Sequence, residues 1–133
     1  MIEFRIDRKS GIPTYVQLAL QVKHALRRGD LALGDKLPTA KDVVSTLAIN
    51  PNTVLKAYKE LEHDGLVEGR PGLGTFVVGS LAKAGMAEKN ALAGELDIWV
   101  SHGASAGLDR SDLQALFEAA LDREFPEPEG RPT

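Results

Sequence analysis

Residues 39–65 have the sequence TAKDVVSTLAINPNTVLKAYKELEHDG, which predicts two short helices joined by a tight turn. Thr39 is a suitable N-cap for the first helix, and Asp42 follows three residues later, as in a capping box. Asn50 can cap the second helix, because Pro51 then occupies the first helical position, where its missing N–H costs nothing. Two short helices in this arrangement are a candidate helix-turn-helix.

The segments on either side predict the rest of a winged domain. Upstream, apolar residues recur at helical spacing from Thr14, and Gly29 is a good stop signal. Downstream, residues 66–70 and 75–78 predict two short strands, and the glycines between them can adopt the positive φ of a hairpin turn. We therefore expect an α+β, mainly α, fold with an N-terminal winged helix-turn-helix over residues 1–78.

Two more helices are predicted after this domain. One extends from about residue 81 or 86 to His102. The other is capped by Asp109, with Asp112 as a second capping-box partner, and is ended by Pro126.

The apolar residues of these two helices form narrow seams that the helices cannot bury alone. We expect a second copy of the chain to cover them, so residues 79–123 are predicted to form the dimerisation arm of a homodimer. Residues 124–133 are predicted to be a disordered tail. The predicted dimer contacts are Leu92, Leu96, Trp99, Leu113, Leu116 and Phe117.

The charge of the chain is unevenly distributed. Residues 1–78 contain 11 Lys and Arg against 9 Asp and Glu, whereas residues 79–133 contain 5 against 10, within a net charge of −3. The total does not indicate nucleic-acid binding, so such a function depends on where the basic side chains lie. There are no cysteines and the first residues do not resemble a secretory signal, so we expect a cytoplasmic protein without disulfides.

The outward face of the second helix of the pair has the chemistry of a DNA-reading surface. On a helical wheel it presents Asn52, Lys56, Lys59 and His63, without a carboxylate. Hydrogen-bonding and cationic groups after a tight turn suit insertion into the major groove, although an ordinary solvated face has the same composition. Two further places suit contact with the sugar-phosphate backbone of DNA. One is Lys41, a cation in the first helix of the pair, and the other is the predicted wing tip with Arg70 and Gly72.

Other chemistries are poorly supported. His24, His63 and His102 lie in different elements, without the short spacing of a metal site. Residues 72–75 lack the lysine and the strand-to-helix setting of a phosphate-binding loop. Nothing is similar to a nucleophile elbow, so we expect neither an enzyme nor a cofactor.

The run GDLALGDKLPT, residues 29–39, resembles the opening signature of GntR-family transcription regulators. Residues 50–67 are similar to the recognition helix and first wing strand of that family, and residues 72–77 to the second strand. Residues 6–17 are similar to its YtrA-like and MocR-like branches. The resemblance covers residues 4–78, and the short remainder favours the YtrA-like branch, whose two helices implicitly serve as a dimerisation arm.

The resemblance implies which residues contact DNA. Thr39 and Lys41 match positions that touch the DNA backbone, and Gly72 matches the wing-tip glycine. The start of the recognition helix is matched by Asn50, Asn52 and Thr53.

Three departures from the family pattern affect these assignments. Lys41 stands where Arg is usual, Ala48 replaces the turn glycine and Pro51 replaces a base-reading Arg of other branches. Operator preference therefore cannot be transferred from those branches.

We predict a homodimeric, sequence-specific DNA-binding transcription regulator. We expect it to act as a repressor on an inverted-repeat operator. The resemblance implies a neighbouring transporter operon as its target. A small-molecule effector is compatible with this function but has no recognisable site. One alternative is a non-catalytic interaction module that keeps the winged fold. Another is a truncated MocR-like protein, which bound pyridoxal phosphate would reveal.

Overall fold

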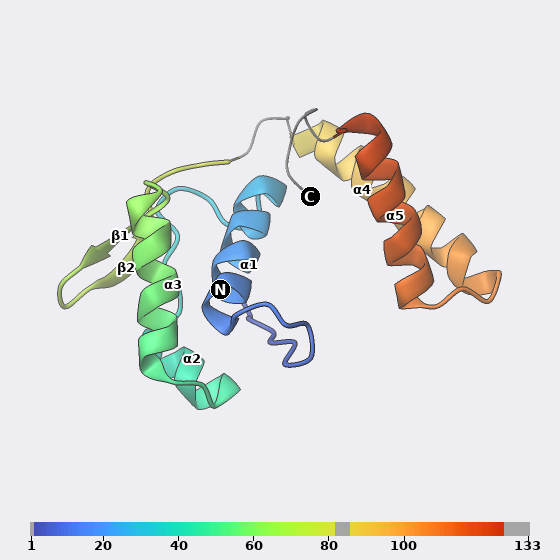
Figure 1. The fold of residues 1–133 in the computed structure, drawn as a ribbon. Helices are drawn as coiled ribbons and strands as arrows, with labels where there is room; N and C mark the ends of the chain where they lie inside the picture. The colour runs from blue at the N-terminus through green and yellow to red at the C-terminus, as the bar shows by residue number, and fades with distance from the viewer. Residues whose placement is uncertain (1, 82–85, 127–133) are drawn as a thin grey trace. The chain divides into compact units, whose positions relative to one another are not determined.

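Three helices and a hairpin make up the first part of the chain in a computed structural model, which describes residues 2–81 and 86–126 (Figure 1). The helices are α1 (Thr14–Arg28), α2 (Ala40–Leu47) and α3 (Pro51–His63), and the strands are β1 (Val67–Arg70) and β2 (Gly74–Val77). Two further helices follow. The chain divides into two compact units, Met1–Met86 and Ala87–Thr133.

The ends of α1, α2 and α3 lie where the sequence predicts them, and local capping groups fix several of these ends. Gly29 adopts a left-handed conformation and its N–H donates to the carbonyls of Ala25 and Leu26. Thr39 and Asp42 form a reciprocal capping box on α2. At the start of α3, the side-chain oxygen of Asn50 accepts a hydrogen bond from the N–H of Asn52 at 2.8 Å.

The core of the first unit lies between α1 and α3. Leu18, Val22 and Leu26 of α1 are buried. Four α3 residues that share one helical face pack there as well: Val54, Ala57, Tyr58 and Leu61. This packing leaves the opposite face of α3 in solvent.

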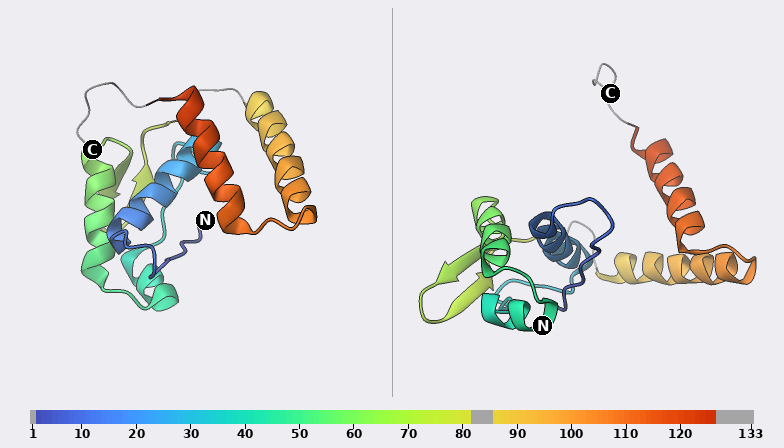
Figure 2. Two further views of the ribbon diagram at one scale, coloured as in Figure 1. Left: turned by 45° about the vertical axis from the view of Figure 1, so that its right-hand side comes forward. Right: turned by 60° about the horizontal axis from the view of Figure 1, so that its bottom comes forward.

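The hairpin is stabilised by a third stretch of extended chain before α2. Strands β1 and β2 pair antiparallel, with Val67 opposite Val77, and project away from the helices (Figure 2). The N–H of Leu37 donates to the carbonyl of Thr75 at 2.9 Å, and the N–H of Val77 donates to that of Asp35 at 2.8 Å. Strand β1 begins one residue after its predicted start and ends where predicted, whereas β2 begins and ends one residue before its predicted bounds.

The turn between α2 and α3 contains the one described non-glycine residue with positive φ. Ala48 has φ 52° and ψ 47°, and its N–H donates to the carbonyl of Val44 at 2.9 Å. A side chain in this conformation is strained, and glycine would adopt it without that steric cost.

Two further helices, α4 (Met86–Ser105) and α5 (Arg110–Glu124), follow and are joined by a short turn. Asp109 and Asp112 form the predicted capping box, and α4 continues three residues beyond the predicted end at His102. A Cβ on Gly103 would clash with the Leu113 side chain, so the missing side chain lets α4 and α5 approach at this point. Of the predicted tail, Glu124 belongs to α5, whereas residues 127–133 lie outside the described residues.

The first unit continues past residue 78, the predicted boundary. The N–H groups of Val78 and Gly79 both donate to the carbonyl of Leu66, and Leu81 packs against the core. The residues that close the core therefore extend to position 81.

Candidate nucleic-acid interface

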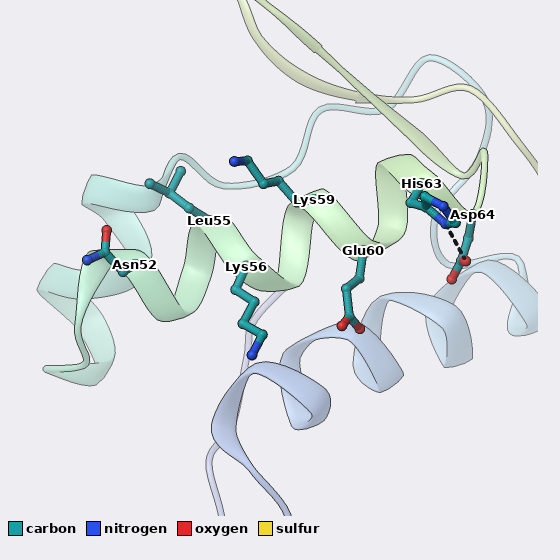
Figure 3. A pocket seen from close by; sticks show the side chains of 7 residues that line it. All are labelled: Asn52, Leu55, Lys56, Lys59, Glu60, His63 and Asp64. Carbon is teal, nitrogen blue, oxygen red and sulfur yellow. Dashed lines mark ion pairs between the residues drawn. The ribbon is translucent and has the colours of Figure 1, made fainter.

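The outward side of α3 is an open hollow lined by polar, cationic and apolar side chains (Figure 3). Four of its side chains recur at steps of three or four residues and follow one helical stripe: Asn52, Leu55, Lys59 and His63. We call these four residues the α3 stripe. The hollow is also lined by Lys56, as the wheel predicts, whereas Leu55 was not predicted on this face.

Lys56 points toward α1. Its ammonium group lies 4.1 Å from the centroid of the Tyr15 ring, a cation–π contact between the two helices (Figure 3). Glu60 points to the same side. The role of Lys56 in DNA binding stays a prediction, and this contact gives it a role within the fold.

Carboxylates are closer to this surface than the sequence analysis expected. Glu60 and Asp64 line the same hollow. Asp64 forms an ion pair with Lys23 of α1 at 3.1 Å and lies 3.9 Å from the imidazole of His63. The carboxylates lie at the C-terminal half of α3, so its first two turns are the half suited to a polyanion.

The first turn of α3 presents one unused side-chain amide. The side chain of Asn52 is exposed and makes no hydrogen bond within the described parts of the chain. Asn50 instead uses its side-chain oxygen as the helix cap, and Thr53 is half-buried. Of these three residues, Asn52 is the one that is exposed and whose side chain makes no hydrogen bond in the described parts of the chain, so its whole amide is available for a ligand.

Helix α2 presents Lys41 in its first turn. The side chain is exposed and has no ion-pair partner in residues 2–81 or 86–126. The helix dipole disfavours a cation near a helix N-terminus, so Lys41 does not stabilise α2. Its position instead suits a contact with an external anion. Thr39 lies just before it and uses its hydroxyl to accept from the N–H of Asp42.

The wing presents Arg70 beside the hairpin tip. Its guanidinium stacks at 4.9 Å from the centroid of the Phe76 ring and lies 3.6 Å from a carboxylate oxygen of Glu68. Gly72 has φ 75° at the tip, which favours glycine.

Lys36 is a basic side chain at the hairpin that was not predicted as a site residue. Its side chain crosses Gly74, where an added Cβ would lie 2.6 Å from the Lys36 Cε. In the sequence, Lys36 is a lysine among the extended residues before α2. Its approach to the hairpin depends on the backbone pairing of residues 35–37 with β2.

The predicted dimer contacts are exposed in the second unit. In the described side chains of that unit, none of the apolar residues is fully buried. Leu113 is half-buried against Gly103. The other five predicted contacts are exposed: Leu92, Leu96, Trp99, Leu116 and Phe117.

A buried tyrosine holds α2 and α3 in register. The hydroxyl of Tyr58 donates to the carbonyl of Pro38 at 2.7 Å, just before the capped end of α2. Burial, and to a smaller extent the charge of Asp42, raises the pKa of Tyr58 well above its usual range.

None of the described helices has the length and apolar character that crossing a bilayer requires. The described residues also contain no group of three or more His, Asp or Glu side chains arranged to hold a metal ion.

The first unit is similar to known regulatory proteins. Residues 14–77 match the family described as bacterial regulatory proteins, gntR family. Over 73 residues, 55% of this chain, the sequence is 42% identical to the HTH-type transcriptional repressor YtrA of Bacillus subtilis. The match spans 56% of that relative, so the chain covers less than two thirds of its length. The family and this relative are transcription regulators and not enzymes, in agreement with the prediction from sequence.

Two solved structures share the fold over most of the chain. A transcriptional antiterminator from Listeria monocytogenes EGD-e has a TM-score of 0.58 and 26% identity, covering 98% of both chains. YtrA from Sulfolobus acidocaldarius, described as a GntR-family transcription factor, has a TM-score of 0.52 and 24% identity, covering 90% of this chain and 97% of that one. These likenesses confirm the predicted winged domain followed by a helical part.

Proposed function

This chain carries a helix-turn-helix domain of the GntR family of bacterial regulatory proteins, and we propose that it is a sequence-specific DNA-binding transcription regulator. The observation that supports this most directly is the α3 stripe. A stable, capped helix presents an unused amide, an apolar side chain and an ammonium group to solvent, on the side away from its own core.

In this proposal α3 enters the major groove with its N-terminal turns against the bases. The side-chain amide of Asn52 can donate to and accept from an adenine edge at the same time. Lys41 of α2 contacts a phosphate on one side, while Arg70 and the tip at Gly72 approach the backbone on the other. Because the hairpin is paired to residues 35–37, the wing is held at a fixed position relative to α2.

We further propose that the protein acts as a homodimer, through α4 and α5, on an inverted repeat. The exposed apolar side chains of the two helices support this, since a second copy would cover them. Two-fold symmetry then matches two recognition helices to two half-sites. Repression follows when the dimer occupies promoter DNA in the cytoplasm, and a neighbouring transporter operon is the proposed target.

A footprint on DNA tests this function. The full chain should protect an operator-sized segment with two-fold symmetry in the region upstream of its own gene. Transcription from that promoter in vitro should fall when the protein is added. A protein-interaction module with the same fold would give no footprint on that DNA or on a library of random duplexes.

A further inference from the structure

Leu55 is an apolar side chain in the middle of a polar, DNA-facing stripe. It is 49% exposed, although the four apolar residues that anchor α3 are all buried. It belongs neither to the core cluster nor to the partly buried side chains that pack against it. The fold of the first unit therefore gives Leu55 no packing role.

The position of Leu55 is fixed by the helix. It follows Asn52 by three residues and precedes Lys59 by four, so all three lie on one side of α3. Lys56 and Glu60 point instead toward α1 (Figure 3). Leu55 thus lies beside the one free amide of the first turn, about 4.5 Å further along the helix axis.

We propose that Leu55 is a specificity-determining residue that contacts the 5-methyl group of a thymine. This inference rests on the proposed DNA-binding function. In the major groove thymine alone among the four bases presents a methyl group, and apolar contact with that methyl is a recognised mode of reading it. Adenine and guanine would place their N7 acceptor against Leu55, which cannot replace the lost water, and cytosine has only a C–H where thymine has its methyl group.

The spacing also limits where the thymine lies. Successive base pairs are about 3.4 Å apart, so neighbouring side chains of the stripe read base pairs that are adjacent or separated by one. The thymine is therefore within two base pairs of the adenine that Asn52 reads in each half-site. The operator should contain these two bases close together.

The test uses the full chain and chemically altered DNA. Selection from random duplexes first gives the preferred site, and each thymine of that site is then replaced singly by deoxyuridine, which lacks only the methyl group. One replacement per half-site should weaken binding about fourfold, which corresponds to about 0.8 kcal/mol for one buried carbon at 1.4 kcal/mol per tenfold. The remaining replacements should leave the affinity nearly unchanged.

The Leu55→Ala variant completes the test. It should bind the thymine and the deoxyuridine duplexes with equal affinity, because the side chain that contacts the methyl is gone. Leu33→Ala is the matched control, since Leu33 is 65% exposed in a loop of the same unit and should keep the full discrimination. Circular dichroism and thermal melting of both variants check that the fold is retained.

The outcomes separate this inference from the proposed function. Equal binding of all singly replaced duplexes by the original protein, or a Leu55→Ala variant that still discriminates, would overturn the role of Leu55 while DNA binding stands. If no sequence is enriched from the random duplexes, the proposed function itself fails, and this inference fails with it.

Discussion

Asn52 and Lys41 offer different chemistry to DNA. Asn52→Ala removes an exposed amide that can bond a base edge at two points, so it should cost about 1–3 kcal/mol on the selected site and relax preference at one base position per half-site. Lys41→Ala removes a point charge, so it should weaken selected and random DNA by similar factors and reduce the salt dependence. Affinity titrations on both DNAs at several salt concentrations measure this. Equal loss on all sequences for Asn52→Ala would make Asn52 a backbone contact.

Tyr58 makes the stability of the first unit depend on alkaline pH. The pKa of Tyr58 is raised in the folded protein, so its hydroxyl ionises at about pH 10 in the unfolded chain but stays neutral in the folded one. The stability that Tyr58 contributes is therefore complete below that pH and is lost as the pH rises above it. Tyr58→Phe leaves the carbonyl of Pro38 without its donor and should cost about 1–2 kcal/mol at neutral pH. Between pH 8 and 10.5 the variant should lose less stability than the original protein.

Urea unfolding at both pH values measures these differences. Tyr15→Phe is the matched control, because Tyr15 is half-buried and its ring still faces Lys56. An identical pH dependence in Tyr58→Phe and the original protein would show that the hydroxyl is not the group responsible.

Single residues also show what the sequence could predict of the site. The caps at Thr39 and Asn50 were predictable, because each depends on groups within three residues along the chain. The direction of Lys56 and the exposure of Leu55 were not, because a helical wheel places residues by angle alone. The packing of α1 against α3 determines which side of α3 is exposed. In that packing the Lys56 ammonium group contacts the Tyr15 ring.

At the level of elements, the turn between α2 and α3 stores backbone strain at Ala48. Ala48→Gly should raise the free energy of unfolding by about 0.5–1 kcal/mol, because glycine adopts positive φ without steric cost. Chemical denaturation measures the change, and DNA affinity should stay the same. Ala32→Gly in the preceding loop is the control and should lower stability, since that residue has no positive φ to relieve. If Ala48→Gly and Ala32→Gly changed the free energy of unfolding equally, the backbone strain assigned to Ala48 would be contradicted.

The hairpin was predicted as an element, but its backbone pairing with residues 35–37 was not. Alternation of residue types and glycines at the tip indicate two local strands, which β1 and β2 confirm. The pairing of residues 35–37 with β2 joins segments about forty residues apart, and no local pattern encodes it. For that reason Lys36 was missed, although its side chain lies across Gly74 at the hairpin.

On the scale of the whole molecule, the two units have different dependence on a partner. The first closes its own core between positions 4 and 81, whereas the described side chains of the second leave their apolar residues exposed. A chain ended after residue 86 keeps Leu81 and should therefore fold as a stable monomer. The full chain should sediment as a dimer.

Loss of the second unit should also weaken operator binding by about 10²-fold or more, because two half-sites are then no longer bound by linked domains.

Trp99, the single tryptophan, gives an independent measurement, since it is 38% exposed within one chain and belongs to the predicted dimer contacts. Its emission should shift to the red as the full protein is diluted and dimers dissociate. Trp99→Phe is the control for that signal and should sediment like the original protein. A truncated chain that still sediments as a tight dimer, or emission that is independent of concentration, would move the dimer contact out of α4 and α5.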